Sequence, residues 1–225
     1  MIRNDEHLCK NTFYPLFVDL RGRTVVVVGG GMVALRKIEG LRGTGARVKV
    51  ISLDIMDEIN REQGIEIIRR GYTPGDLMGA SLVIAATDDE TINRAISMDA
   101  VRAGIFCNVV DKPELCSFIV PSVVEKGPIK IAISTGGISP TLSKRLRMEI
   151  GRHIGAEYAT LALIMGKIRP LVIAGEGGFE NHKKLFELLI NSELIDAIRV
   201  NDRAHAETIL FDALGEHIDL SGIMP

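Results

Sequence analysis

Short apolar runs alternate with amphipathic stretches along the first half of the chain. Residues 24–28 contain four consecutive valines, a pattern typical of a strand that is buried on both faces. The sequence predicts further strands over 13–20, 47–52, 65–68, 81–86 and 105–110, and helices over 32–41, 53–62 and 90–103. Strands that alternate with helices in this way predict an α/β fold with a doubly wound parallel sheet.

The pattern changes after residue 111. Two extended runs, 117–124 and 129–134, flank a Gly-Pro turn and predict a β-hairpin. Ser139 before Pro140 predicts the start of a basic helix, because serine caps helix N-termini and proline fits the first helical turn. We expect this helix over 141–152, and we expect residues 155–214 to be mostly helical with one strong break at 175–178.

Glycines follow the valine run directly. Gly29, Gly31 and Ala34 match the spacing G-x-G-x-x-G/A of dinucleotide-binding turns. The first glycine permits a tight turn, the second lets the backbone approach a pyrophosphate, and the alanine lets the helix pack close to the strand. The N-terminus of the helix then offers free N–H groups to the phosphates. The alternative is a glycine-rich turn without a ligand, but the strand before the turn and the helix after it favour a dinucleotide.

Composition and charge exclude several classes of function. The chain has 225 residues, of which 46% are hydrophobic and 25% charged, and its net charge is −2. This balance is ordinary for a globular protein and supplies no basic field for nucleic acid or anionic membranes. No apolar run approaches the ~20 residues of a membrane helix, and residues 1–11 lack the apolar core of a signal peptide. The three cysteines and five histidines show no metal-ligand spacing, so we expect no metal site and a reducing, cytoplasmic setting.

Polar residues follow the predicted strands at their carboxyl ends, where ligands bind in open α/β sheets. Asp54 follows the second strand and could bond the ribose of a cofactor, which would disfavour a 2′-phosphate; alternatively it caps the next helix. After the fourth strand, Thr87 could contact the cofactor, whereas Asp88 or Asp89 could simply cap a helix. Asp111 follows the fifth strand, where a carboxylate could accept a proton as hydride leaves a substrate. The alternative for Asp111 is a loop aspartate that only bonds backbone N–H groups.

A second helix N-terminus precedes the basic helix. Thr135, Gly136 and Gly137 lie in this turn, and Lys144 and Arg145 follow on the helix. N–H donors and cations together suit a polyanionic small molecule. The alternative is a capped helix with a solvated basic face.

Several segments, in this order, resemble the precorrin-2 dehydrogenases, the N-terminal type of siroheme synthase, some of whose members are also sirohydrochlorin ferrochelatases. The segments are 14–20, 28–37, 85–89, 107–111, 117–122 and 134–140. The likeness covers roughly residues 13–150 well and is loose beyond them. Some relatives carry a fused methyltransferase; this chain ends at Pro225, so we expect that activity on another protein.

The resemblance implies a fold and an assembly. It implies an NAD-binding Rossmann domain over 1–115, a hairpin-and-helix dimerisation region over 116–150, and a small helical domain over 151–225. The chain would form a homodimer.

The resemblance also implies a reaction. The chain would oxidise precorrin-2 to sirohydrochlorin with NAD, with ferrochelation, for which Fe²⁺ is a substrate, as a possible second activity. Asp111 would be the catalytic residue. The predicted cofactor-binding residues are Gly29, Gly30, Gly31, Met32, Val33, Leu53, Asp54 and Thr87, and the predicted substrate-binding residues are Thr135, Gly136, Gly137, Lys144 and Arg145. A competing hypothesis is a non-enzymatic NAD-sensing regulatory domain, which does not account for segment 108–111 joined to segment 134–140.

Overall fold

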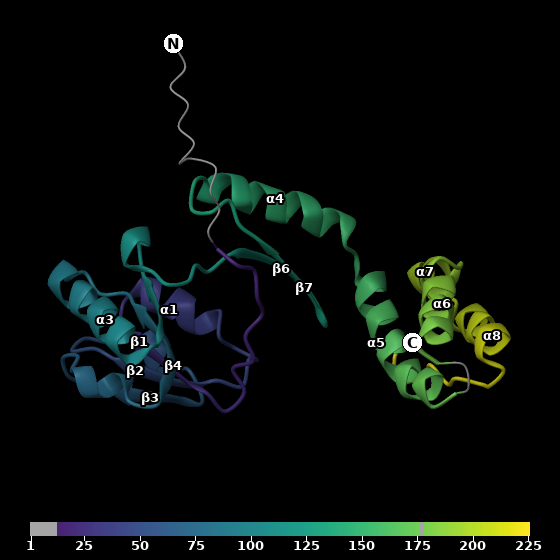
Figure 1. The fold of residues 1–225 in the computed structure, drawn as a ribbon, viewed down its shortest axis with the longest axis horizontal. Helices are drawn as coiled ribbons and strands as arrows, with labels where there is room; N and C mark the ends of the chain where they lie inside the picture. Colours follow the sequence, from purple (N-terminus) through teal and green to yellow (C-terminus); the bar gives the residue numbers. More distant parts are fainter. Residues whose placement is uncertain (1–12, 176–177) are drawn as a thin grey trace, which may run out of the picture. The chain divides into compact units, whose positions relative to one another are not determined.

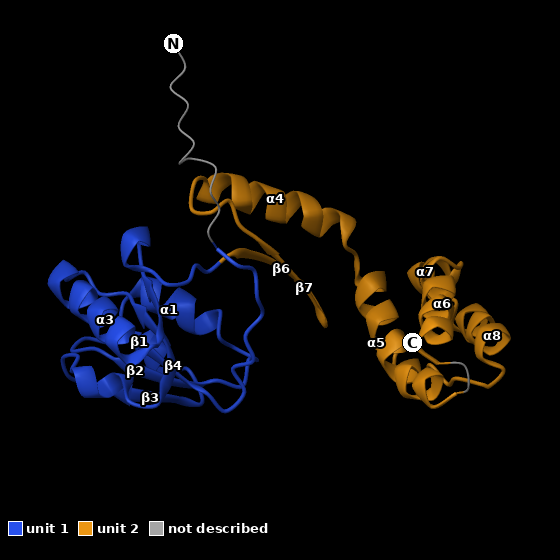
Figure 2. Ribbon diagram, in the orientation of Figure 1, with its two compact units in different colours: residues 1–120 blue, residues 121–225 orange. Residues whose placement is uncertain are grey.

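The computed structural model describes residues 13–175 and 178–225 (Figure 1). It divides the chain into two compact units, residues 1–120 and residues 121–225 (Figure 2). Cys9, one of the three cysteines, and residues 1–11, which lack a signal-peptide pattern, lie outside the described residues, as does part of the predicted break at 175–178.

A five-stranded parallel sheet forms the centre of the first unit. Its strands are β1 (Thr24–Val28), β2 (Arg47–Ile51), β3 (Ile65–Ile68), β4 (Ala80–Ala85) and β5 (Phe106–Val109). They lie in the order β3-β2-β1-β4-β5, so Val28 of β1 pairs with Ile51 on one side and with Ala85 on the other. The direction of winding reverses between β1 and β4, which makes this edge of the sheet the topological switch point. The prediction of a Rossmann-type doubly wound sheet is confirmed.

Helices cover both faces of this sheet. They are α1 (Met32–Glu39), α2 (Asp57–Asn60) and α3 (Glu90–Ala103), with short 3₁₀ helices η1 (Pro74–Leu77) and η2 (Pro113–Leu115). Val27 packs in one core with Ala34 of α1, whereas Val28 packs in the other core with Ile96 of α3. Valines 25–28 are at most 3% exposed. Burial on both faces therefore explains the uninterrupted valine run.

The second unit joins a β-hairpin to a group of helices. Strands β6 (Ser122–Lys126) and β7 (Ile129–Ile133) pair antiparallel, and helix α4 (Pro140–His153) lies along the hairpin (Figure 1). The remaining helices are α5 (Ala156–Ala174), α6 (Gly178–Ile190), α7 (Leu194–Arg199) and α8 (Arg203–Leu214). They enclose a separate core that includes Ile164, Leu194, Leu210 and Leu220.

One strand prediction is wrong, and another begins too early. Residues 13–20 form no strand: Tyr14 and Phe17 are 83% and 71% exposed, and no described strand pairs with this segment. Residues 117–120 are also irregular, and the hairpin begins only at Ser122. Apolar alternation alone did not distinguish these segments from strands that have a pairing partner.

The helix predictions also need correction. The helix predicted over 53–62 is reduced to the single turn of α2, because residues 53–56 form a loop tied to the glycine turn by Met56 N–H donating to Gly30 O at 2.9 Å. Helix α1 ends at Glu39 rather than near residue 41. The break near 175 is not the only one, because turns at 191–193 and 200–202 separate α6, α7 and α8.

Candidate nucleotide-binding site

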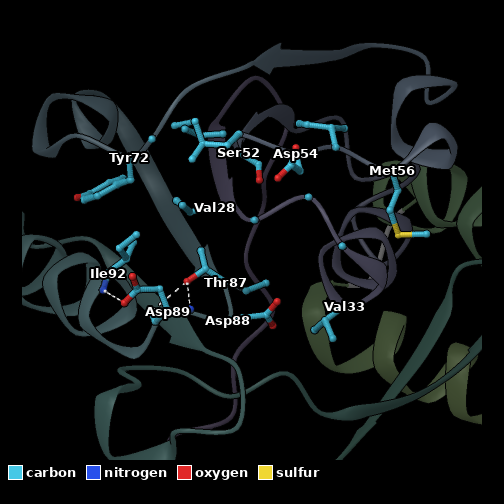
Figure 3. A pocket seen from close by; sticks show the side chains of 18 of the residues that line it. Val28, Val33, Ser52, Asp54, Met56, Tyr72, Thr87, Asp88, Asp89 and Ile92 are labelled. Atoms are coloured by element: carbon cyan, nitrogen blue, oxygen red, sulfur yellow. Dashed lines mark hydrogen bonds between the residues drawn. The ribbon is translucent and has the colours of Figure 1, made fainter.

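A cavity of about 1030 Å³ opens at the carboxyl ends of β1, β2, β3 and β4. This is the switch-point edge, where ligands bind in open α/β sheets. The volume is at the upper end of small-molecule pockets, which span about 300–1,000 Å³. The lining residues, most of which Figure 3 draws, are 28–33, 51–56, 69–72, 86–89 and Ile92.

The three glycines after β1 have different structural requirements. Gly29 has φ +122°, and a Cβ there would lie 2.3 Å from the carbonyl oxygen of Ala86. A Cβ on Gly30 would lie 2.0 Å from the carbonyl oxygen of Asp54. A Cβ on Gly31 would meet no atom within 4 Å. Gly29 and Gly30 thus let neighbouring loops close against the turn, whereas Gly31 leaves its backbone open to a ligand in the cavity.

The N-terminus of α1 has the features of an anion-binding site. Gly31 is its N-cap, no side chain of the described chain caps it, and its first turn contains no acidic residue. The first N–H groups of a helix have no partner within the helix, and the macrodipole makes this end positive. Phosphates bind at such ends, so the open backbone at Gly31 and the uncapped helix fit the pyrophosphate of a dinucleotide.

The loop after β2 supplies one acidic side chain to the cavity. Asp54 is exposed and lies with Ser52 on one wall (Figure 3). Helix α2 begins after Met56, and no side chain caps it within the part of the chain that the structure describes. The alternative in which Asp54 caps this helix is therefore wrong. Contact of Asp54 and of the exposed Leu53 with a cofactor remains a prediction.

The loop after β4 contains a residue that caps helix α3 and residues that line the cavity. The Asp89 carboxylate accepts hydrogen bonds from Thr91 N at 2.8 Å and from Ile92 N at 3.1 Å, which confirms that it caps α3. The Thr87 hydroxyl lies 2.8 Å from Asn93 Oδ1 and 3.1 Å from Asp89 O, and has one hydrogen to donate. Thr87 therefore shapes the wall. Asp88 and Asp89 are both exposed, and Asp88 is the one that does not cap α3.

Sequence reasoning missed the loop after β3. Residues 69–72 line the cavity, and Tyr72 lies on the same side as Ile92 (Figure 3). The Tyr72 hydroxyl donates to Asp99 Oδ2 at 3.1 Å, and burial together with this carboxylate raises the pKa of Tyr72. The run Arg-Arg-Gly-Tyr directly after a parallel strand was the signal that could have identified this wall.

Asp76 holds this loop in place. Its carboxylate accepts hydrogen bonds from Arg70 Nη1 at 2.7 Å, from Arg70 Nη2 at 2.5 Å and from Thr73 N at 2.8 Å. The Arg70 guanidinium, with the Thr73 bonds, holds the pKa of Asp76 below its usual value of 3.8. We predict that Asp76→Asn lowers the free energy of unfolding at neutral pH by about 2 kcal/mol, because charge-assisted bonds to a buried carboxylate are lost.

The pH dependence of this loss follows from the sign of the pKa shift. A carboxyl whose pKa is depressed by folding stabilises the protein above the unfolded-state pKa, and this contribution disappears as pH falls through the folded-state pKa. The difference between wild type and Asp76→Asn, measured by urea unfolding, is therefore expected to shrink on acidification. The control is Glu66→Gln, whose exposed pair with Lys49 spans 3.9 Å and is worth at most about 1 kcal/mol. Equal losses in the two variants at neutral pH would contradict the prediction.

Asp111 lies on the same sheet edge but does not line the cavity. Val110 N–H donates to Ala85 O at 3.0 Å, so Asp111 follows directly beside the loop that begins at Ala86. Its φ is +58°, a left-handed conformation that costs a non-glycine residue roughly 1–2 kcal/mol and that aspartate tolerates better than most.

The Asp111 side chain is exposed, and its carboxylate makes no hydrogen bond or ion pair with any residue in 13–175 or 178–225. The alternative in which it only bonds backbone N–H groups is therefore wrong. Lys37 of α1 attracts it electrostatically, although burial lowers the pKa of this lysine. A free carboxylate in a strained backbone conformation is a candidate for function; its catalytic role remains a prediction.

The predicted substrate-binding residues all lie in the second unit. The Thr135 hydroxyl accepts from Ser139 N at 3.0 Å, and Ser139 caps α4 by accepting from Leu142 N at 3.2 Å, as predicted for this serine. Gly136 and Gly137 adopt positive φ in the same turn. Lys144 and Arg145 line a separate cavity of about 690 Å³ on α4, with the other lining residues Thr141, Met148, Glu149, Arg152 and His153. Their contact with substrate remains a prediction.

Within residues 13–175 and 178–225, no group of three or more His, Cys, Asp or Glu side chains is arranged to hold a metal ion. None of the described helices combines the length and apolar character that crossing a membrane requires.

Comparison with known proteins agrees with this geometry. A family model described as "Putative NAD(P)-binding" matches residues 16–122, and one described as "Sirohaem biosynthesis protein central" matches residues 126–153. A siroheme synthase from Ectopseudomonas mendocina is 38% identical over 203 residues, which is 90% of this chain and 44% of that protein. The chain is therefore similar to the N-terminal part of siroheme synthases and contains a match to the NAD(P)-binding model over the residues that line the cavity.

A second siroheme synthase is similar to the chain in sequence, and one solved structure is similar to it in fold. A siroheme synthase from Thioalkalivibrio sulfidiphilus is 39% identical over 210 residues, 92% of this chain and 43% of that protein. The chain thus spans less than half the length of these relatives. The solved structure of SirC, precorrin-2 dehydrogenase, matches with a TM-score of 0.75 and 23% identity, covering 91% of this chain and all of that one. At this identity the match supports the fold. The cavity lies wholly within the residues matched by the NAD(P)-binding model.

Proposed function

We propose that the chain is an NAD-dependent dehydrogenase that oxidises precorrin-2 to sirohydrochlorin. The single observation that carries this proposal is the unpaired carboxylate of Asp111, held in a left-handed turn beside the loop that walls the nucleotide cavity. The similar siroheme synthases and the solved relative named precorrin-2 dehydrogenase support the choice of substrate.

The cofactor is bound by backbone and by side chains of the first unit. The uncapped N-terminus of α1 and the open backbone of Gly31 hold the pyrophosphate, with Met32 and Val33 at the start of the helix. Leu53 and Asp54 contact the adenosine ribose, and the Asp54 carboxylate disfavours a 2′-phosphate there, so NAD is preferred to NADP. Gly29, Gly30 and Thr87 shape the turn and wall that support these contacts.

Asp111 takes the proton in the reaction. Oxidation removes one hydride and one proton from the tetrapyrrole, and NAD⁺ supplies the hydride acceptor when it is bound. A base within hydrogen-bond reach of the proton lowers the barrier, and an exposed carboxylate without an internal partner is free to act as one. Thr135, Gly136, Gly137, Lys144 and Arg145 bind the carboxylates of precorrin-2, because cations and helix N-terminal N–H groups attract a polyanion.

Several further features belong to the same proposal. Residues 116–150 form a dimerisation region between the NAD-binding domain over 1–115 and the helical domain over 151–225, and the enzyme is a cytoplasmic homodimer. A second activity inserts Fe²⁺, as a substrate, into sirohydrochlorin, with Asp111 accepting the pyrrole protons.

The deciding experiment is an assay with precorrin-2 and NAD⁺ that follows NADH absorbance. We expect NADH to form in proportion to precorrin-2 consumed. NAD⁺ binding without NADH formation would overturn the proposal and favour the NAD-sensing regulatory domain. A parallel assay of sirohydrochlorin with Fe²⁺ tests the second activity independently.

A further inference from the structure

The thiol of Cys116 lies against the turn that carries Asp111. Val109 N–H donates to Cys116 Sγ at 3.2 Å, and the sulfur lies 3.2 Å from Val109 O and 3.3 Å from Lys112 O. It therefore contacts the backbone on both sides of Asp111. A cysteine removed from solvent ordinarily behaves as a small apolar residue with a weak S–H donor. The sulfur of the half-buried Cys116 instead makes polar contacts with residues 109 and 112 of the backbone.

Without the contacts of the Cys116 sulfur, the 109–112 turn has only a weak hydrogen bond of its own. Its own closing hydrogen bond, from Lys112 N to Val109 O, is 3.4 Å long, beyond the usual range of such bonds. Within the described residues, Asp111 and Asn201 are the non-glycine residues with positive φ. A turn that contains a left-handed aspartate and is closed by a weak hydrogen bond needs a further constraint. The contacts of Cys116 supply this constraint.

The rest of the loop is fixed independently of Cys116. Ser117 N donates to Cys107 O at 2.8 Å, and Cys107 N donates to Ser117 Oγ at 2.8 Å. Asn108 Nδ2 contacts Cys116 Sγ at 3.6 Å but also donates to Phe118 O at 3.1 Å, and the Ser97 hydroxyl donates to Leu115 O at 2.8 Å. Loss of the Cys116 sulfur is therefore expected to release the turn at 109–112 while the loop remains attached to β5 and α3.

Charged and titratable groups surround the sulfur on several sides. Lys37 of α1 interacts with both Cys116 and Asp111, Glu114 lies on the same loop, and Cys107 lies on β5. Burial raises the pKa of Cys116, which keeps the thiol protonated and able to donate to a carbonyl oxygen at neutral pH. The thiol is thus suited to hydrogen bonding in this turn rather than to nucleophilic chemistry.

We propose that Cys116 is a positioning residue for the dehydrogenation: its sulfur holds the 109–112 turn in the conformation that presents the Asp111 carboxylate to the substrate. This inference rests on the proposed function, because it assigns Cys116 a role only through Asp111. A small misplacement of a reacting group can cost about 100-fold in rate.

The test compares Cys116→Ala, Cys116→Ser and Cys107→Ala. Cys116→Ala is expected to lower kcat on precorrin-2 by about 100-fold without changing the Kd for NAD⁺, and to speed amide hydrogen exchange within 109–112 but not within β1. Cys116→Ser, which retains a donor and acceptor, is expected to restore most of kcat and the slow exchange. Cys107→Ala removes a buried thiol that has no bond to the turn, so it is expected to lower thermal stability and leave kcat unchanged.

The outcomes separate this inference from the function on which it rests. An active wild type with equally active Cys116→Ala would overturn the role of Cys116 alone. So would a loss of kcat that Cys116→Ser does not restore, or one that Cys107→Ala reproduces, because either result indicates a general effect of stability. An inactive wild type that still binds NAD⁺ would overturn the proposed function and the role of Cys116 together.

Discussion

Replacement of Asp111 by asparagine is expected to lower kcat on precorrin-2 by about 10²–10⁴-fold, the usual contribution of a general base, while NAD⁺ binding is retained. Asparagine is the matched substitution because it tolerates the left-handed φ of +58° and keeps the size of the side chain. The loss therefore reports the missing carboxylate rather than a changed turn. Steady-state kinetics with precorrin-2 and calorimetric titration with NAD⁺ measure the two quantities.

The control for this prediction is Glu114→Gln. Glu114 is an exposed carboxylate in η2, three positions further along the same loop. The Glu114→Gln variant should retain full activity. This result would exclude the possibility that loss of any negative charge near β5 lowers kcat. Turnover by Asp111→Asn at the wild-type rate would remove Asp111 from the mechanism.

Gly31→Asp is expected to weaken NAD⁺ binding by about 3 kcal/mol, or about 100-fold in Kd, because a carboxylate would face the pyrophosphate at the N-terminus of α1. The structure makes this a clean test. An added Cβ meets no protein atom within 4 Å at Gly31, whereas at Gly29 or Gly30 it would clash with the backbone of Ala86 or Asp54. The variant should therefore fold normally and lose only the ligand.

The matched control for Gly31→Asp is Gly166→Asp. Gly166 is an exposed glycine of α5 where a Cβ also meets nothing within 4 Å. The same chemical change far from the nucleotide cavity in sequence, and in the other unit, should leave the Kd for NAD⁺ as it is. An unchanged Kd in Gly31→Asp would contradict the placement of the pyrophosphate at this helix.

The parts of the fold that could be predicted are those where burial leaves a pattern in the residue types. The valines of β1 are buried on both faces, and the helix 90–103 has the bounds that were predicted, with Asp89 as its cap and left-handed Gly104 at its end. Residues 13–20 have similar alternation but no strand to pair with. Pairing is a tertiary property, so the local pattern could not exclude a strand there.

The candidate site was predictable in its position but not in its conformations. The glycine turn, Asp54 and Thr87 line the cavity, and their position was predictable because ligands gather at the carboxyl ends of parallel strands. Their contact with a cofactor remains a prediction. The requirement for glycine at position 30 depends on the approach of the Asp54 carbonyl, which is distant in sequence. The left-handed turn at Asp111 depends in the same way on contacts with Cys116 that spacing does not reveal.

The left-handed backbone of Asp111 lowers the stability of the fold, whereas its side chain is the group on which the proposed reaction depends. Glycine is the residue that relieves a positive φ at least cost, yet glycine would remove the carboxylate on which the proposed reaction depends. A screen that rewards heat resistance alone would therefore favour Asp111→Gly and select a more stable protein that lacks the carboxylate proposed as the base. Engineering this chain for durability should hold position 111 constant and seek improvement elsewhere.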